Sequence, residues 1–133
     1  MKSLFDIRDK VVVMTGGTGV LGRAICSHLA KEGAKVVILG RKAEVGNAQV
    51  EAIKAEGGEA MFLATDVMDR EKLEQNLQDI MTAYGRVDAL LNAAGGNMPG
   101  ATISPDGNIF DLKAEDFQQV LNLNLVGTVL PTQ

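Results

Sequence analysis

The sequence predicts a doubly wound α/β fold, a parallel sheet with helices on both faces, of which this chain supplies the first four strands. Two observations carry this prediction: short β-branched runs alternate with amphipathic stretches, and the first run stops at a cluster of glycines. Strand–helix–strand units connect by right-handed crossovers, which makes the sheet parallel. Ligands bind beyond the carboxyl ends of such strands, so these ends are the places to search for a site.

The first half of the chain contains two strand–helix units. Residues 11–15 are a short β-branched run, which suits a strand that is buried on both faces. The apolar residues that follow recur at helical spacing, and they are Leu21, Ala24, Ile25 and Leu29. This pattern stops at Gly33, a suitable helix terminus. Residues 34–39 repeat the strand pattern, and residues 41–56 predict a second helix.

The second half continues the alternation. Residues 60–64 predict a third strand, and Asp69 can cap the helix that follows it. The apolar residues of this helix form one amphipathic face, and they are Leu73, Leu77, Ile80, Met81 and Tyr84. Residues 87–91 predict a fourth strand. After a loop, the segment from Lys113 to the C-terminus predicts a helix with a break near Asp116.

Length and composition restrict the kind of protein. The chain of 133 residues suits one domain, and 46% hydrophobic with 23% charged residues is ordinary for a globular protein. A net charge of −4 argues against nucleic acid and anionic lipid as partners. The single cysteine, Cys26, and the single histidine, His28, offer no disulfide and no metal cluster. Residues 1–9 lack a signal-peptide core and no apolar run approaches the ~20 residues of a membrane span, so we expect a cytoplasmic protein.

A glycine-rich motif lies between the first strand and the first helix. Gly17, Gly19 and Gly22 match the pattern GxGxxG. Glycines allow a tight turn and let backbone amides approach a pyrophosphate, which the positive end of the helix stabilises. A plain glycine turn is the alternative, but the strand–turn–helix setting favours a dinucleotide site. The residues expected to bind the cofactor here are Gly16, Thr18, Gly19, Leu21 and Gly22.

The end of the second strand bears on the choice of cofactor. Sites for NAD usually carry an acidic residue here, whereas this chain has Arg41 followed by Lys42. An arginine can bind a 2′-phosphate through two hydrogen bonds, which favours NADP over NAD. The two basic residues could instead be the solvated start of a helix, so both cofactors stay open.

Four motifs in order resemble the short-chain dehydrogenase/reductase family. They are the glycine loop 15–22, the pair Asp66 and Val67, the segment 92–95 and the segment 124–127, and the resemblance runs from residue 10 to the last residue. It implies a Rossmann fold in which Asp66 and Val67 contact the adenine. It further implies cofactor contacts from Asn92, Ala93, Ala94 and Gly95, and a supporting role for Asn124 in a proton relay. The activity implied is hydride transfer between a nicotinamide and a secondary alcohol or ketone.

The chain departs from the family pattern in two ways. Val20 stands where the standard branch has a glycine, and the resulting spacing is similar to that of epimerase-like members acting on nucleotide sugars. The family's catalytic Ser, Tyr and Lys would lie beyond Gln133, and the only tyrosine, Tyr84, belongs to a core-facing stripe. We therefore expect residues 1–133 to be the N-terminal NAD(P)-binding part of a longer enzyme, and we expect this part alone to be inactive.

The remaining expectations concern substrate and partners. Gly95 to Asn97 and the stretch 104–107 resemble members that act on sugar acids of the mannonate/fructuronate type. The resemblance implies a small-molecule substrate. The apolar last helix and the edge of the fourth strand need partner surfaces, which predicts a homo-oligomer. A non-catalytic nucleotide-binding module and an epimerase-like enzyme are the alternative functions.

Overall fold

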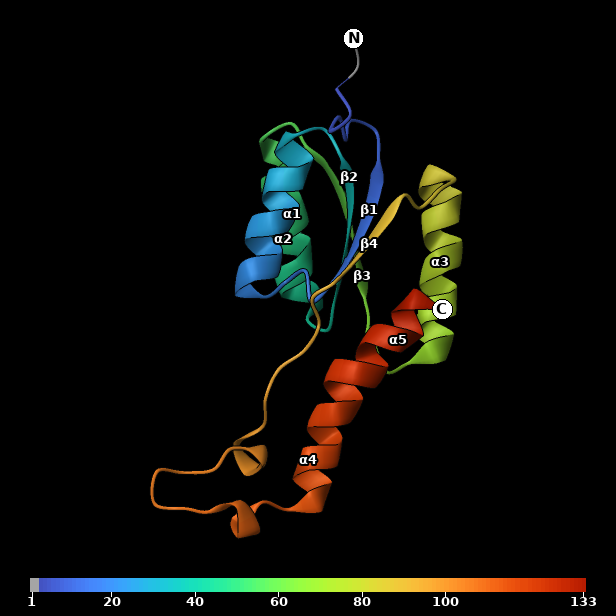
Figure 1. Ribbon diagram of the computed structural model, residues 1–133. Helices are drawn as coiled ribbons and strands as arrows, with labels where there is room; N and C mark the ends of the chain where they lie inside the picture. Colours follow the sequence, from blue (N-terminus) through green and yellow to red (C-terminus); the bar gives the residue numbers. More distant parts are fainter. Residues whose placement is uncertain (1–2) are drawn as a thin grey trace.

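Residues 3–133, which the computed structural model describes, form a four-stranded parallel sheet with helices on both faces (Figure 1). The strands are β1 (Val11–Thr15), β2 (Lys35–Gly40), β3 (Glu59–Ala64) and β4 (Ala89–Asn92). The α-helices are α1 (Val20–Lys31), α2 (Ala43–Ala55), α3 (Arg70–Tyr84), α4 (Ala114–Leu121) and α5 (Gly127–Thr132). The sheet order is β3-β2-β1-β4, so the predicted doubly wound α/β class is confirmed.

The register of the sheet brings the carboxyl ends of the strands together. Val13 pairs with Val37 of β2 on one side and with Leu90 of β4 on the other. At the end of β1, Thr15 pairs with Asn92 of β4. The loops that leave these strands therefore start at the same edge of the sheet, where a doubly wound fold binds its ligands.

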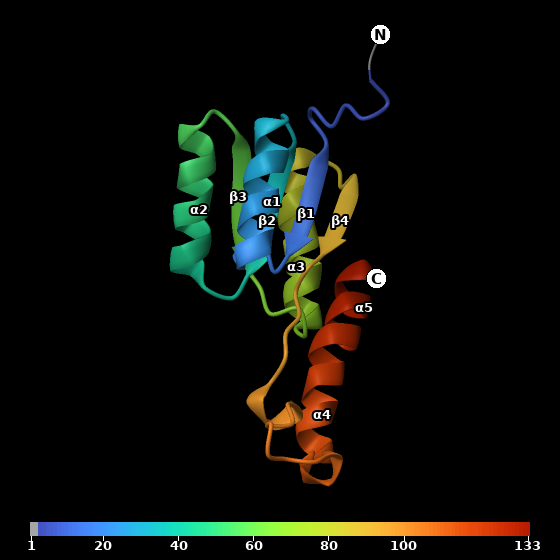
Figure 2. The ribbon, with the colours of Figure 1, turned by 60° about the vertical axis from the view of Figure 1, so that its left-hand side comes forward.

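Two apolar layers cover the sheet. Helices α1 and α2 lie on one face and α3 lies on the other (Figures 1 and 2). The cluster under α1 and α2 contains Val12, Met14, Cys26, Ala30, Val36, Ile38, Val50 and Ile53. The cluster under α3 contains Val11, Val13, Val37, Leu39 and Ile80, with Tyr84 packed against it. Strand β1 is thus buried on both faces as predicted. Tyr84 packs against the core, also as predicted.

The buried face of α1 differs from the predicted one. Leu21 is 76% exposed and Ile25 is 40% exposed, whereas Gly22, Cys26 and Ala30 are buried. These three residues are small and follow one another at a spacing of four, so they let the helix approach the sheet closely. Of the predicted face only Leu29 packs against the core, so the prediction was wrong for Leu21, Ala24 and Ile25.

Helix α3 has the predicted N-cap and, at its other end, a glycine cap that the sequence analysis did not name. The carboxylate of Asp69 accepts a hydrogen bond from the Lys72 backbone N–H at 3.0 Å, which makes it the N-cap. Gly85 ends the helix in the left-handed region with φ 71°, and its N–H donates to the carbonyl of Met81. The helix starts directly after Asp69, as expected. The predicted apolar face is only partly confirmed, because Leu73, Ile80 and Tyr84 belong to the core whereas Leu77 and Met81 are exposed.

The C-terminal helix extends beyond the sheet edge (Figure 2). It passes through Asp116 without the predicted break, because Asp116 lies in the first turn of α4, where a negative charge stabilises a helix. The irregularity comes later, where a π-helical segment, Asn122–Val126, joins α4 to α5. Two short 3₁₀ turns, Pro99–Ala101 and Ile109–Asp111, lie in the loop between β4 and α4.

Candidate functional site

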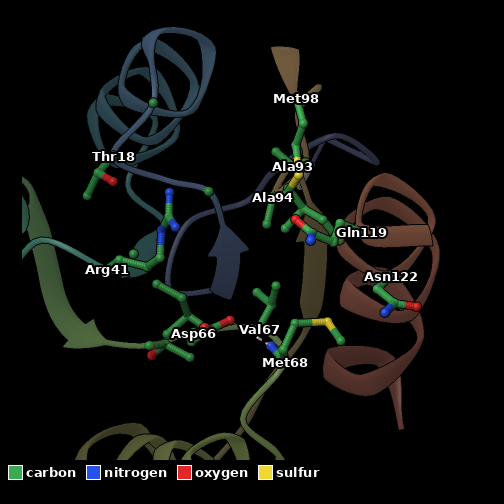
Figure 3. Close-up of a pocket in the computed structure, with 17 residues that line it drawn as sticks. Thr18, Arg41, Asp66, Val67, Met68, Ala93, Ala94, Met98, Gln119 and Asn122 are labelled. Atoms are coloured by element: carbon green, nitrogen blue, oxygen red, sulfur yellow. Dashed lines mark hydrogen bonds between the residues drawn. The ribbon is translucent and has the colours of Figure 1, made fainter. Parts of the chain in front are cut away.

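A hollow of about 530 Å³ lies beyond the carboxyl ends of the strands (Figure 3). The predicted site residues that line it are Gly16, Thr18, Gly19, Arg41, Asp66, Val67, Ala93, Ala94 and Gly95. Figure 3 shows Thr18, Arg41 and Asp66 on one side, with Gln119 of α4 and Asn122 of the π-helical segment on the other. The tertiary structure thus gathers the glycine loop, Arg41, the pair Asp66 and Val67, and residues 93–95 around one cavity.

The glycine loop has backbone conformations and close contacts that disfavour any residue with a side chain. Gly16 has φ 63°, and a Cβ there would lie 2.6 Å from the carbonyl oxygen of Ala93. A Cβ on Gly22 would lie 2.3 Å from the carbonyl oxygen of Gly16, so α1 packs directly on the loop. Gly19 is the N-cap of α1, and neither a side-chain cap nor an acidic first-turn residue neutralises that helix end. The loop and the helix end are therefore suited to an anionic group such as a pyrophosphate.

Thr15 joins the glycine loop to the segment after β4. Its side chain is fully buried, and its Oγ1 accepts hydrogen bonds from the N–H groups of Ala93 and Ala94, both at 3.1 Å. Sequence reasoning treated Thr15 as the end of a strand and did not select it as a site residue. A hydroxyl at the end of a buried strand was the available signal, because such a group must find a partner across the sheet edge.

The end of β2 and the loop after β3 form the next part of the wall. Arg41 is exposed at the end of β2 and borders the hollow. Asp66 accepts a hydrogen bond from the Met68 N–H at 2.9 Å, and Val67 is only 7% exposed. Because Asp69 caps α3, Asp66 does not serve as the helix cap and keeps its place beside the hollow.

Four predicted site residues lie outside the lining of the hollow. Leu21 is largely exposed on α1, and Gly22 packs against the loop backbone. The Nδ2 of Asn92 donates to Oγ1 of Thr132 at 3.0 Å, which ties β4 to α5. Asn124 is the fourth, and its contacts are with backbone groups.

Asn124 holds the loop after β4 against the π-helical segment. Its Nδ2 donates to the carbonyl oxygens of Gly96 and Val120 at 2.7 and 2.8 Å, and its Oδ1 accepts from the Gly96 N–H at 3.1 Å. The pair of bonds to Gly96 fixes both backbone polar groups of that residue. A π-helical turn at this point is typical of functional sites.

The far wall of the hollow was missed by sequence reasoning. Its side chains come from the loops after β3 and β4, from α4 and from the π-helical segment, and they are Met68, Met98, Gln119, Asn122 and Leu123. The sequence predicted this last helix but offered no signal for the angle at which it faces the strand ends. Only the packed structure places it there.

Within residues 3–133, no group of three or more His, Cys, Asp or Glu residues is arranged to hold a metal ion. No helix in the same range is long and apolar enough to cross a membrane. Cys26 is free and buried, and burial raises the pKa of its thiol to about 11.

The chain belongs to the short-chain dehydrogenase family, whose model matches residues 10–133. It is 42% identical over 136 residues to UxuB, an uncharacterized oxidoreductase of Bacillus subtilis, covering 96% of this chain and 49% of the relative. It is 33% identical to a 3beta-hydroxysteroid dehydrogenase of Mediterraneibacter gnavus, covering 88% and 40%.

Solved structures give the same assignment. A protein from Haemophilus influenza, provisionally assigned as a D-mannonate oxidoreductase and solved with bound NAD, matches with a TM-score of 0.87 and 32% identity. The match covers 96% of this chain and 49% of that structure. The chain thus spans about half the length of the relatives it matches. Its family is that of the short-chain dehydrogenases, as the sequence motifs implied.

Proposed function

We propose that this chain is the dinucleotide-binding part of an oxidoreductase that transfers hydride between a nicotinamide and a secondary alcohol or ketone. One observation carries the proposal: the glycine loop, Arg41, Asp66 and the segment after β4 border a single hollow at the strand ends. This is where a doubly wound fold binds a dinucleotide. The bound dinucleotide would supply the hydride chemistry, and the chain's own residues would bind and orient it.

The residues at the hollow fit such a ligand. Backbone amides around Gly19 and the N-terminus of α1 would hold the pyrophosphate. Asp66 and Val67 would contact the adenine, and the segment Ala93 to Gly95 would line the opposite side of the cofactor. Asn124, through its bonds to Gly96, would keep that segment in place beside the reacting end.

We propose NADP as the preferred cofactor, with NAD as the second choice. Arg41 forms no ion pair with the acidic residues of the described chain, and the residue after it is Lys42. No carboxylate therefore stands at the end of β2 to select a free ribose 2′-hydroxyl. The related Haemophilus structure contains NAD, so the experiment must include both dinucleotides.

Calorimetric titration with NADP and with NAD tests the proposal. Replacement of Arg41→Ala removes a charge-assisted hydrogen-bond donor, so we expect NADP affinity to fall by roughly 10- to 100-fold while NAD affinity is unchanged. Lys54→Ala is the matched control, because Lys54 is an exposed cation at the far end of α2, the helix that follows Arg41. Equal losses for both dinucleotides would contradict the 2′-phosphate assignment, and no binding by the unmodified chain would refute its dinucleotide role.

For the substrate we propose a sugar acid of the mannonate/fructuronate type. The loop that follows Gly95 borders the hollow through Met98, on the side where a substrate would approach. The related Haemophilus protein carries the provisional D-mannonate assignment. D-mannonate, titrated in the presence of saturating dinucleotide, is therefore the first substrate to examine.

We also propose a cytoplasmic homo-oligomer. Exposed apolar residues recur every four positions along the C-terminal helix, and they are Phe117, Leu121, Leu125 and Val129 at 50%, 39%, 61% and 45% exposure. A continuous stripe of this kind favours contact with another protein surface, and a second copy offers an identical stripe. The free, buried thiol of Cys26 suits a reducing compartment.

A further inference from the structure

Gln49 is a buried polar side chain that reaches from α2 to the glycine loop. It is 6% exposed, and its Nε2 donates to the carbonyl oxygen of Gly17 at 3.1 Å. Its Oε1 has no hydrogen-bond partner among residues 3–133. Since a carbonyl oxygen only accepts, the amide nitrogen and not the amide oxygen must face Gly17. The side chain therefore directs its donor to the loop and leaves its acceptor unpaired.

Folding stability alone does not explain this choice of residue. A buried acceptor without a partner costs free energy, and α2 already packs on the sheet through the buried residues Val50 and Ile53. A methionine at position 49 would fill similar space and would leave the Gly17 oxygen unpaired in place of Oε1. One acceptor is unpaired in either case, so the free energy of folding should change little. The role of the hydrogen bond is then to set the position of the glycine loop.

Both backbone polar groups of Gly17 are hydrogen-bonded. Its N–H donates to a carbonyl oxygen of β2 at 3.2 Å, and its own carbonyl accepts from Gln49. The next two residues, Thr18 and Gly19, line the hollow. Helix α2, which carries Gln49, begins two residues after Arg41. One buried hydrogen bond thus joins the glycine loop to helix α2, which directly follows the segment that carries Arg41.

We infer that Gln49 is a positioning residue for dinucleotide binding. It sets the place of the glycine loop relative to the Arg41 segment, acting through the Gly17 carbonyl and without contact with the ligand. The inference rests on the proposed dinucleotide function and adds a residue that neither the glycine motif nor the strand-end search identified.

Three variants test the inference by calorimetric titration with NADP and NAD and by thermal unfolding. We expect Gln49→Met to bind both dinucleotides about tenfold more weakly, the equivalent of one hydrogen bond, with an unchanged melting temperature. The control is Gln78→Met, the same substitution at an exposed position of α3, which should change neither quantity. A residue with a merely structural role would lower the melting temperature instead.

Gln49→Glu adds a readout that depends on pH. An ionised carboxylate cannot donate to Gly17, so this variant should bind weakly in alkaline buffer. Burial raises the pKa of a carboxyl group, and the protonated form can donate its O–H to the same carbonyl. We therefore expect affinity to recover on mild acidification for Gln49→Glu and to stay low for Gln49→Met.

The outcomes separate this inference from the proposed function. Wild-type affinity in Gln49→Met, or affinity losses that simply follow melting temperature, would overturn the inference while the dinucleotide function stands. If the unmodified chain binds neither dinucleotide, the proposed function fails, and hydrogen exchange in the free protein still decides the positioning role. Faster exchange at Thr18 and Gly19 in Gln49→Met supports that role, and unchanged exchange overturns it.

Discussion

Replacement of Gly22→Ala measures how closely α1 packs on the glycine loop. An added Cβ would lie 2.3 Å from the Gly16 carbonyl oxygen and 2.8 Å from the Cα of Gly17. These neighbours are backbone atoms, so they cannot rotate away as a side chain would. The contact with Gly16 must open from 2.3 Å to at least 3.0 Å, which requires the helix or the loop to move.

Two opposing free-energy changes set the magnitude. Alanine in a helix is favoured over glycine by about 1 kcal/mol. Overpacking against rigid neighbours costs up to about 3 kcal/mol, and the backbone contact places Gly22 at the upper end of that range. The net loss is about 2 kcal/mol of unfolding free energy, equivalent to roughly 8 °C in melting temperature for a chain of this size.

Thermal unfolding followed by circular dichroism measures this loss. Gly19→Ser is the matched control, since its Cβ would lie 3.3 Å from the same Gly16 oxygen and serine is a favoured N-cap residue. We expect the control to melt within about 2 °C of the unmodified chain. A Gly22→Ala variant that melts at or above the unmodified chain would show that the loop yields without cost, and would refute the reasoning.

Two further predictions concern acid stability and assembly. The pKa of Asp88 is lowered to about 2, mainly by the hydrogen bond from Arg86 and next by that from the Val11 N–H. The ionised carboxylate therefore stabilises the folded protein fully above the unfolded pKa of 3.8, and this stabilisation is lost as pH falls toward 2. Asp88→Asn should therefore lower the melting temperature near neutral pH, and this difference should vanish at about pH 2; a constant difference would contradict the linkage. Leu125→Arg should shift the protein toward the monomer in size-exclusion chromatography, whereas the control Leu77→Arg on α3 should not. If both variants elute alike, the apolar stripe of the C-terminal helix is not the subunit contact.

Much of the fold could be predicted from sequence because its signals are local. The β-branched run at 11–15 matches β1, the run at 34–39 matches β2 to within one residue, and Asp69 marks the start of α3. The right-handed crossover predicts parallel strands once the alternation is known, but the order β3-β2-β1-β4 is seen only in the tertiary structure. The sequence was less reliable for α1, where small buried residues rather than large apolar ones face the sheet. The fourth strand also begins two residues later than expected, at Ala89.

The site was partly predictable for the same reason. The sequence by itself determined the glycine loop, Arg41 and the polar strand ends, because each depends on neighbouring residues and on one strand terminus. The tertiary structure alone decided which side chains meet across the fold: Thr15 with the segment after β4, Gln49 with Gly17, and the α4 wall with the strand ends. Such contacts join residues that are tens of positions apart, and a hydrogen bond between them forms only after packing has fixed the distance and angle of the elements that carry them.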